Sequence, residues 1–241
     1  MGVFDLIKKE FLLAKGKEKI PLLYSHFSFI VRNKEIQEFL AKDEYERVRI
    51  FIFLNTVDQK ILALGKDDIS VEVRTIVAEK ARNTAVLDFM ANDPSLAVKR
   101  IVAKSVYISN DTALKLARDP AISVKVEIIE NKKQFILNNE IFYSLVDGNS
   151  SFLLLKILEK DILLGEQICY ILDRCKERSV LFKILAHKST PRDVLERFFD
   201  SNPEDVMNNR SLNPFTKIFL RTIVLAKQDG SKVTYSDLLK N

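Results

Sequence analysis

The residues with the clearest case for chemistry are acidic and basic residues that recur together at a fixed spacing. Four times, an aspartate is followed five residues later by a valine and immediately afterwards by an arginine or lysine. The aspartates step along the chain by 25, 25 and 26 residues. The four pairs are Asp43 with Arg49, Asp68 with Arg74, Asp93 with Lys99, and Asp119 with Lys125. Such a constant period predicts either a line of charge that binds a ligand or a set of structural ion pairs.

Both interpretations of these eight residues start from repeated units that stack. In the first, the four cations form a line that tracks the phosphates of a nucleic acid. In the second, each aspartate caps a helix and pairs with a basic residue of its own or the next unit. Because the two signs occur in equal numbers and in fixed register, we interpret the eight residues as a structural ladder.

The remaining residues that could do chemistry are few. Cys169 and Cys175 are six residues apart, which on a helix places them about 240° apart, on different faces. His26 and His187 lie far apart in the sequence, and no Ser, Cys or carboxylate stands at a recognisable catalytic spacing from either. We therefore expect no catalytic site, no metal site and no cofactor.

The net charge is +5, from 38 basic and 33 acidic residues, a mild excess that is compatible with nucleic-acid binding. The densest local excess lies in 206–232. On a helix, Lys217 and Arg221 would share a face, with Lys227 about 120° around from Lys217. This incomplete stripe predicts weak, sequence-independent nucleic-acid binding of micromolar or poorer affinity. The candidate contacts are Arg210, Lys217, Arg221 and Lys227.

The elements that position these residues follow from apolar spacing. After each basic residue comes an apolar helix face, as in Val73, Ile76 and Val77, and then a second one, as in Val86, Leu87 and Met90. Two such short helices cannot bury their own apolar faces, so neighbouring units must stack. Residues 1–40 predict two further helices, and 213–227 predicts a final one. We expect five prolines to begin helices, namely Pro94, Pro120, Pro191, Pro203 and Pro214.

The predicted fold is all-α, a right-handed α-solenoid of about six to seven two-helix repeats of ~25 residues with atypical terminal helices. Six Gly and six Pro in 241 residues are too few for the tight turns of a β-sandwich. We predict a single domain over 1–241, with N-terminal cap helices in 1–42 and regular repeats in 43–130. Degenerate repeats follow in 131–210 and a C-terminal cap in 211–241.

A family resemblance emerges along the run Asp93-Pro94, Val98-Lys99, Val102-Ala103-Lys104 and Leu116-Ala117-Arg118-Asp119-Pro120. It resembles the leucine-rich repeat variant, a bacterial relative of HEAT-type helical repeats, over roughly 43–210 and most strongly in 66–130 and 186–206. The resemblance implies an armadillo-type right-handed superhelix of paired helices, the first sometimes of 3₁₀ character. Some members hold an iron–sulfur centre on an N-terminal Cys cluster, but the first cysteine here is Cys169, so no cluster is expected.

The aromatic residues predict mostly packing. Five phenylalanines fall at core-like positions, whereas Tyr107 and Tyr143 could be exposed and Tyr107, near Lys104, could stack on bases. We interpret both tyrosines as core or loop filling. The core-like phenylalanines are Phe51, Phe53, Phe89, Phe198 and Phe199.

These observations favour a non-enzymatic binding or scaffold module for a protein partner. The alternative is a sequence-independent nucleic-acid-binding protein, similar in shape to the HEAT-like alkylpurine DNA glycosylases of DNA repair. A chain without Trp and without their motifs makes the enzymatic form improbable. No stretch is apolar enough for a transmembrane helix and the start lacks the order of a signal peptide, so we expect a cytoplasmic protein with no membrane contact.

Overall fold

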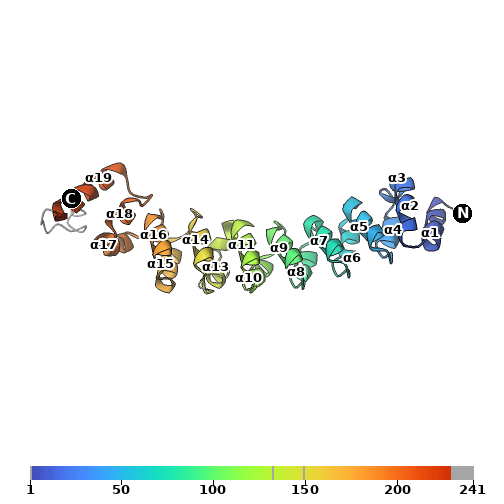
Figure 1. Ribbon diagram of the computed structural model, residues 1–241, viewed down its shortest axis with the longest axis horizontal. Coiled ribbons are helices and arrows are strands. Elements are labelled where there is room, and N and C mark those ends of the chain that lie inside the picture. The colour runs from blue at the N-terminus through green and yellow to red at the C-terminus, as the bar shows by residue number, and fades with distance from the viewer. Residues whose placement is uncertain (1, 132, 149, 229–241) are drawn as a thin grey trace. The chain divides into compact units, whose positions relative to one another are not determined.

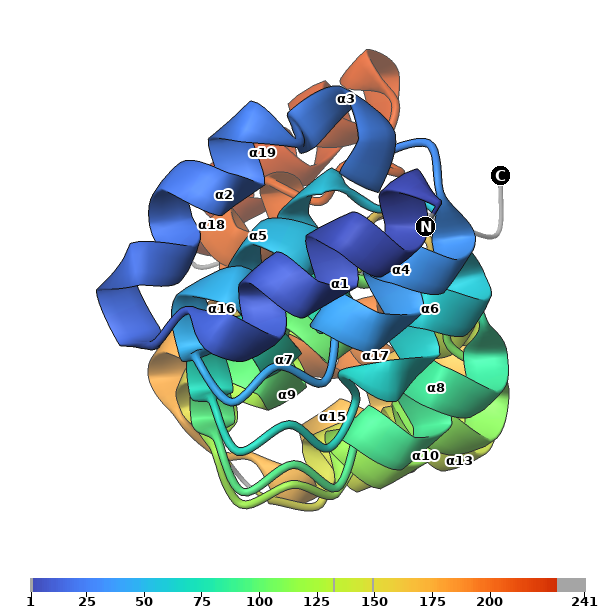
Figure 2. The ribbon, with the colours of Figure 1, turned by 90° about the vertical axis from the view of Figure 1, so that its right-hand side faces the viewer.

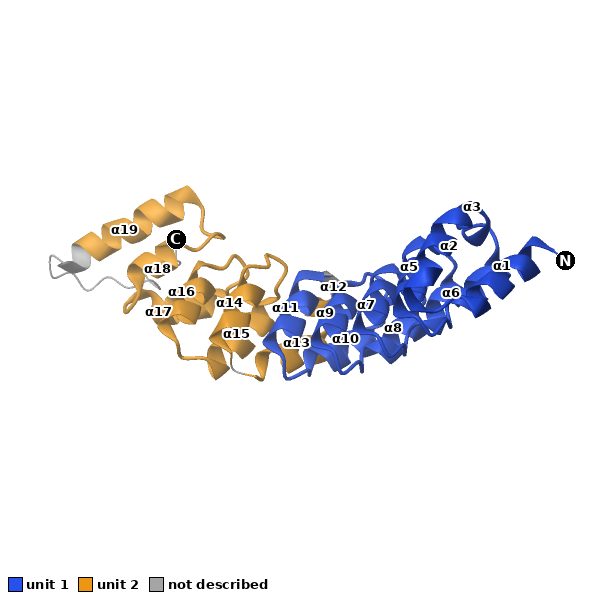
Figure 3. Cartoon of the chain, turned by 45° about the vertical axis from the view of Figure 1, so that its right-hand side comes forward, with its two compact units in different colours: residues 1–131 blue, residues 132–241 orange. Residues whose placement is uncertain are grey.

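The computed structural model describes residues 2–131, 133–148 and 150–228, and every regular element in those ranges is a helix (Figure 1). The all-α prediction is confirmed. The contacts divide the chain into two compact units, residues 1–131 and 132–241 (Figure 3). The boundary between them falls just after the last of the four aspartate signatures, where the sequence pattern fades.

In its described part, residues 2–131, unit 1 contains eleven α-helices and one short 3₁₀ helix. They are α1 (Val3–Leu13), η1 (Gly16–Glu18), α2 (Lys19–Ser25), α3 (Phe27–Ile30), α4 (Lys34–Leu40), α5 (Glu46–Asn55), α6 (Gln59–Leu64), α7 (Val71–Lys80), α8 (Thr84–Met90), α9 (Leu96–Lys104), α10 (Asn110–Ala117) and α11 (Ile122–Asn131). The first helix after each aspartate signature is α-helical, so the 3₁₀ character that the family resemblance implies is absent from α5, α7, α9 and α11.

The helix pair α7 and α8 shows how the sequence forms one unit. The Ser70 hydroxyl accepts a hydrogen bond from Val73 N at the start of α7, and the Asn83 side chain accepts one from Ala85 N at the start of α8. Such caps satisfy backbone N–H groups that have no partner within the helix. Below them, the predicted apolar faces are buried, including Val73 and Val77 of α7 and Leu87 of α8.

Successive first helices pack on one another, α5 on α7, α7 on α9 and α9 on α11. Viewed end-on, α6, α8 and α10 follow one another on one side of unit 1, with α5, α7 and α9 on the other (Figure 2). The packing is tight at Gly65, where an added Cβ would lie 2.7 Å from Phe53 Cζ and 2.9 Å from Val77 Cγ2. A glycine is therefore required sterically at this position.

The N-terminal stretch differs from the prediction, because residues 1–40 hold four α-helices rather than two. Gly16 has a φ of 48°, a left-handed conformation that glycine adopts readily, and it separates α1 from α2. Asn33 accepts a hydrogen bond from Ile36 N and thereby starts α4 as a separate helix.

The prediction for the prolines is correct at Pro203 and Pro214, which are the first residues of α18 and α19. It is wrong at Pro94 and Pro120, which precede the first residues of α9 and α11 by two positions, and Pro191 is the N-cap of α17 rather than its first residue. Asp93 and Asp119, which precede Pro94 and Pro120, each accept a hydrogen bond from the backbone N–H two residues ahead, so a turn precedes each helix.

Unit 2 contains α12 (Lys133–Leu137), α13 (Asn139–Val146), α14 (Ser151–Leu158), α15 (Gly165–Arg174), α16 (Arg178–Ala186), α17 (Arg192–Phe199), α18 (Pro203–Met207) and α19 (Pro214–Gln228). Helix α14 packs on α16 and α16 on α18, which contacts α19. The core at the C-terminal end of the unit consists of Leu185, Val194, Leu195, Phe199, Val206, Leu220 and Ile223. None of the described helices has the length and apolar run that crossing a bilayer takes.

The aromatic residues divide differently from the prediction. Phe53 and Phe199 are buried, but Phe89 is 48% exposed, and its ring lies 4.8 Å from the Lys66 ammonium. Phe51 and Phe198 are half-buried. The periodic pattern marks the inward half of each helix but does not separate a core position from one at its rim.

Candidate binding groove

The charged ladder consists of ion pairs between neighbouring units. Arg49 donates from Nε to Asp68 at 2.7 Å and from Nη2 at 2.9 Å, and Arg74 donates in the same way to Asp93 at 2.6 and 3.1 Å. Lys99 Nζ lies 2.5 Å from Asp119. Arg49, Arg74 and Lys99 therefore each reach forward to the next unit's aspartate. An additional pair, between Lys19 and Asp43 at 2.9 Å, extends the ladder towards the N-terminus.

Each aspartate also has a local role, which differs from the predicted helix cap. The Oδ1 atom accepts a hydrogen bond from the backbone N–H two residues ahead, which shapes the turn before the helix. In two of the units the N-cap position itself is occupied by Ser70 and Ser95. These turn bonds come from Tyr45 N, Ser70 N, Ser95 N and Ala121 N.

Burial makes the ladder unavailable to a polyanion. The side chains of Arg49 and Asp68 are 7% and 8% exposed, and the hydrogen bond that Arg49 donates to Asp68 raises the pKa of Arg49. Although burial opposes the change, hydrogen bonds from Lys99 and Ala121 lower the pKa of Asp119. Lys125, half-buried on α11, has no ion-pair partner among the described residues.

The C-terminal basic residues do not converge on one site. Arg210 Nη1 lies 2.9 Å from Asp161, so its charge is already paired. Lys217 and Arg221 lie one turn apart on α19, beside the exposed side chains of Phe215 and Ile218. The Lys227 side chain lies outside the described part of the chain.

The cysteines and histidines form no shared site. Both cysteines are free, and Cys175 is buried. His26 Nε2 lies 2.6 Å from Glu10 in unit 1, whereas His187 is in unit 2. No group of three or more His, Cys, Asp or Glu within the described ranges could hold a metal ion.

His187 has a structural environment that predicts pH dependence. It is fully buried, its Nδ1 accepts a hydrogen bond from Ser189 N at 3.1 Å, and its Nε2 donates to Lys160 O at 3.2 Å. A backbone N–H can only donate and a carbonyl can only accept, so these partners fix the neutral ring with its proton on Nε2. Burial lowers the pKa of His187.

We therefore expect the stability of unit 2 to fall as the pH drops below about 6.5. In that range the unfolded chain protonates this histidine while the folded chain resists protonation, with a slope of at most about 1.4 kcal/mol per pH unit. His187→Asn should flatten the difference between urea unfolding curves at pH 7.5 and 5.5, followed by far-UV circular dichroism. His26→Asn is the matched control and should keep the difference in stability between pH 7.5 and pH 5.5. An equal pH dependence of unfolding in the two variants would contradict the assignment of this effect to His187.

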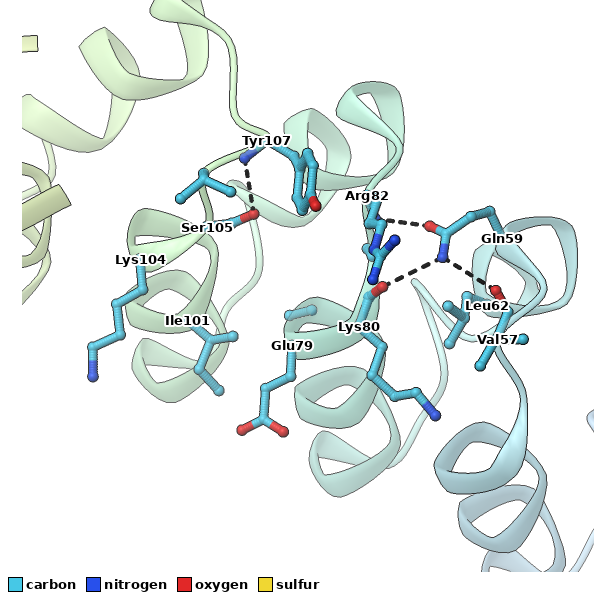
Figure 4. Close-up of a pocket in the computed structure, with 13 residues that line it drawn as sticks. Val57, Gln59, Leu62, Glu79, Lys80, Arg82, Ile101, Lys104, Ser105 and Tyr107 are labelled. Atoms are coloured by element: carbon cyan, nitrogen blue, oxygen red, sulfur yellow. Dashed lines mark hydrogen bonds between the residues drawn. The ribbon is translucent and has the colours of Figure 1, made fainter. Parts of the chain in front are cut away.

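A groove of about 740 Å³ lies at the C-terminal ends of α7 and α9 (Figure 4). Leu62 and Ile101 contribute apolar surface, and Glu79, Arg82 and Tyr107 are among its charged and aromatic lining residues. The Arg82 guanidinium lies 6.0 Å from the centre of the Tyr107 ring. The groove thus combines apolar surface, an aromatic ring and charges of both signs.

Hydrogen bonds fix the polar side of the groove. Gln59 Oε1 accepts from Arg82 N at 2.7 Å, and Gln59 Nε2 donates to Lys80 O at 3.4 Å. Ser105 Oγ accepts from Tyr107 N at 3.3 Å. The Lys80 ammonium donates away from the groove centre, to Phe53 O at 2.8 Å and Leu54 O at 2.5 Å, and burial lowers the pKa of Lys80.

Four apolar side chains of α2, α3 and α5 form what we call the aromatic face (Tyr24, Phe27, Phe51 and Leu54), in which Phe51 is half-buried. The rings of Tyr24 and Phe27 meet the Phe51 ring edge-on, with centroids 6.1 and 5.8 Å apart. Tyr24 is 71% and Leu54 56% exposed. Val57, three residues after Leu54, is 85% exposed and lines the groove. Clustered exposed apolar side chains are typical of binding sites.

The sequence pattern pointed to little of this groove. Tyr107 was named with Tyr143 as a residue that could be exposed but was interpreted as core or loop filling, and it is 43% exposed; Gln59, Glu79 and Arg82 gave no signal in the sequence. They are brought together by the packing of one unit on the next. Comparison with family models, with curated proteins and with solved structures finds no match to this chain.

Proposed function

We propose that the chain is a helical-repeat binding module, non-enzymatic, whose groove at the ends of α7 and α9 holds a peptide segment of a partner protein. The proposal includes the predicted right-handed α-solenoid of the leucine-rich repeat variant or HEAT-like type. The repeated ion pairs support it, because one unit's cation on the next unit's aspartate is what stacking of equivalent units requires.

The observation that carries the proposal is a groove that combines polar groups with exposed apolar side chains. Val57 of its lining follows Leu54 of the aromatic face by three residues, and both are exposed. A protein segment supplies both apolar side chains and backbone hydrogen-bonding groups, so it fits such a surface. Protein-binding hot spots are also enriched in Tyr and Arg, and both types line this groove at Tyr107 and Arg82.

The charges of the lining favour a segment with acidic residues. Arg82 and Lys104 are lining cations that a ligand can meet, and Glu79 is the one carboxylate in the lining. Lys104 is 3.6 Å from Glu127, a distance that leaves it able to contact a second carboxylate. No imidazole or thiol is among the lining side chains, which supports binding without catalysis.

Nucleic acid is the second candidate, and one observation favours it. Lys217 and Arg221 form no ion pair with a described residue and lie one turn apart on α19. Two cations on one helix account for only a small part of the phosphate contacts of a tight complex. Of the ladder cations in unit 1, Arg49, Arg74 and Lys99 already bind aspartates.

A library of random 12-residue peptides tests the proposal, with affinities of selected peptides measured by fluorescence polarisation. We expect selected peptides to combine apolar residues with Asp or Glu. Leu54→Asp and Arg82→Glu should each weaken binding at least about 10-fold. Leu12→Asp and Lys115→Glu are matched controls, since both side chains are exposed outside the groove, and should leave the affinity unchanged.

Three outcomes would overturn the proposal. In the first, no peptide is selected, and in the second, the control variants weaken binding as much as the groove variants. The third is a gel shift with single-stranded or duplex DNA of submicromolar affinity at physiological salt that Lys217→Glu and Arg221→Glu abolish, in which case nucleic acid replaces a protein partner.

A further inference from the structure

The last carbonyl groups of an α-helix have no N–H partner within the helix. In this protein a side chain from a later segment often serves them. Lys80 Nζ donates to Phe53 O and Leu54 O at the end of α5. Asn131 Nδ2 donates to Ala103 O at 2.5 Å and Ser105 O at 3.0 Å, at the end of α9. In unit 2, Asn209 Nδ2 does the same for Leu185 O and His187 O at the end of α16.

The donors in unit 1 occupy one column of the repeat. Lys80 follows Asp68 by twelve residues, and Asn131 follows Asp119 by twelve. The residue at the same place after Asp93 is Ser105. A serine side chain is too short to span the distance that Lys and Asn cover, and its Oγ is engaged by Tyr107 N.

Helix α7 is consequently left without this support. The last backbone hydrogen bond at the end of α7 is the one that Ala81 N donates to Val77 O. The next N–H, that of Arg82, donates to the Gln59 side chain rather than to Ala78 O. Within the described residues, the one side-chain donor to the carbonyls of 78–80 is Gln59, at 3.4 Å from Lys80 O. Ala78 and Lys80 line the groove, so these carbonyls lie beside the space that a bound ligand would occupy.

The missing donor and the groove coincide, since Ala78, Glu79, Lys80 and Ser105 all line it. We propose that this end of the groove is a subsite for a primary carboxamide, the side chain of an Asn or Gln in the bound peptide. The incoming –NH₂ donates to the α7 carbonyls as Asn131 does at α9. This inference rests on the proposed peptide-binding function and names the residue type that the peptide must carry.

The surrounding charges select a neutral donor. A lysine ammonium would also satisfy two carbonyls, as Lys80 does at α5. At the α7 end, however, it would stand among Lys80, Arg82 and Lys104 with Glu79 as the one carboxylate in the lining. A carboxamide supplies two N–H donors without like-charge repulsion.

Ser105→Asn tests the subsite because it places in the chain the donor that the peptide would bring. We expect it to raise the melting temperature by about 2–4 °C, since it supplies the absent hydrogen bonds. It should also weaken the selected peptides at least about 10-fold, and those peptides should be enriched in Asn or Gln at one position. Replacing that peptide residue by Ala should weaken binding to the wild type but not to Ser105→Asn.

Two further variants control for the introduced amide. Asp111→Asn adds one on the exposed surface of α10 and should change neither melting temperature nor peptide affinity. Asn131→Ser opens the corresponding gap at α9 and should lower the melting temperature.

The outcomes separate this inference from the proposed function. Peptides that bind the groove without Asn or Gln enrichment, and whose affinity Ser105→Asn leaves intact, would overturn the subsite and keep the function. An unchanged or lowered melting temperature for Ser105→Asn would show that the α7 carbonyls lack no donor, which overturns the subsite by itself. If no peptide binds at all, both fail.

Discussion

Asp93→Ala is expected to lower the free energy of unfolding of unit 1 by about 3 kcal/mol, because it leaves a buried arginine without its counter-charge. The side chains of Arg74 and Asp93 are only 11% and 4% exposed. The substitution also removes the acceptor for Ser95 N in the turn before α9. The sequence pattern alone suggested a loss of about 1–2 kcal/mol for a cap and a charge partner; burial of both partners raises the expected loss.

Asp147→Ala is the matched control, since Asp147 also pairs with an arginine but at the surface. Its contact with Arg174 is 3.2 Å long, with 57% of the aspartate side chain exposed, and such pairs contribute below about 1 kcal/mol. Urea unfolding followed by circular dichroism measures both losses, and hydrogen exchange of 71–104 assigns the first to unit 1. Equal losses in the two variants would contradict the buried-pair account.

The double variant Arg74→Met with Asp93→Ala tests whether the loss in Asp93→Ala comes from the unpaired charge of Arg74. Replacing both charges removes the unpaired cation that makes the single variant costly, so the double variant should be more stable than Asp93→Ala alone. If the double variant instead loses as much free energy of unfolding as the two single variants do together, the loss comes from the turn before α9 and from packing.

The repeat pattern predicted the helices and the ladder because both depend on local periodicity. Val73 and Val77 recur at helical spacing and are buried, and the aspartate column marks the turn before each first helix. The pattern left open whether each cation pairs within its own unit or with the next. Arg49 pairs with Asp68, 19 residues ahead, rather than with Asp43, and that choice depends on how the units pack.

The groove could not be predicted for a related reason. The column that contains Lys80, Ser105 and Asn131 has no common residue type, so it carries no signal in the sequence. Lys80 and Asn131 share a task, donation to the end of the preceding first helix, which becomes visible only when the units are stacked. Ser105 is conspicuous because it occupies that column without performing the task.

Asn209→Asp is expected to destabilise unit 2 by about 3–5 kcal/mol at pH 7, because it buries a charge against two carbonyl oxygens. Asn209 is fully buried, and its Nδ2 donates to Leu185 O and His187 O, each at 2.7 Å. Its Oδ1 accepts from Ser211 N and Ser211 Oγ. One side chain thus ties the end of α16 to the segment before α19. An aspartate keeps the shape but replaces both donors with an acceptor.

The neighbouring residue provides the control, since Asn208→Asp makes the same chemical change at an exposed position. A negative charge at the C-cap of α18 should cost below about 1 kcal/mol. Both cysteines of the chain lie in unit 2, where Cys169 packs against the core cluster, so the rate of thiol labelling in urea reports the opening of this unit. Labelling should become much faster in Asn209→Asp and change little in Asn208→Asp. Equal rates would mean that α16 is held in place by the apolar core alone, with no contribution from the side chain that serves its final carbonyls.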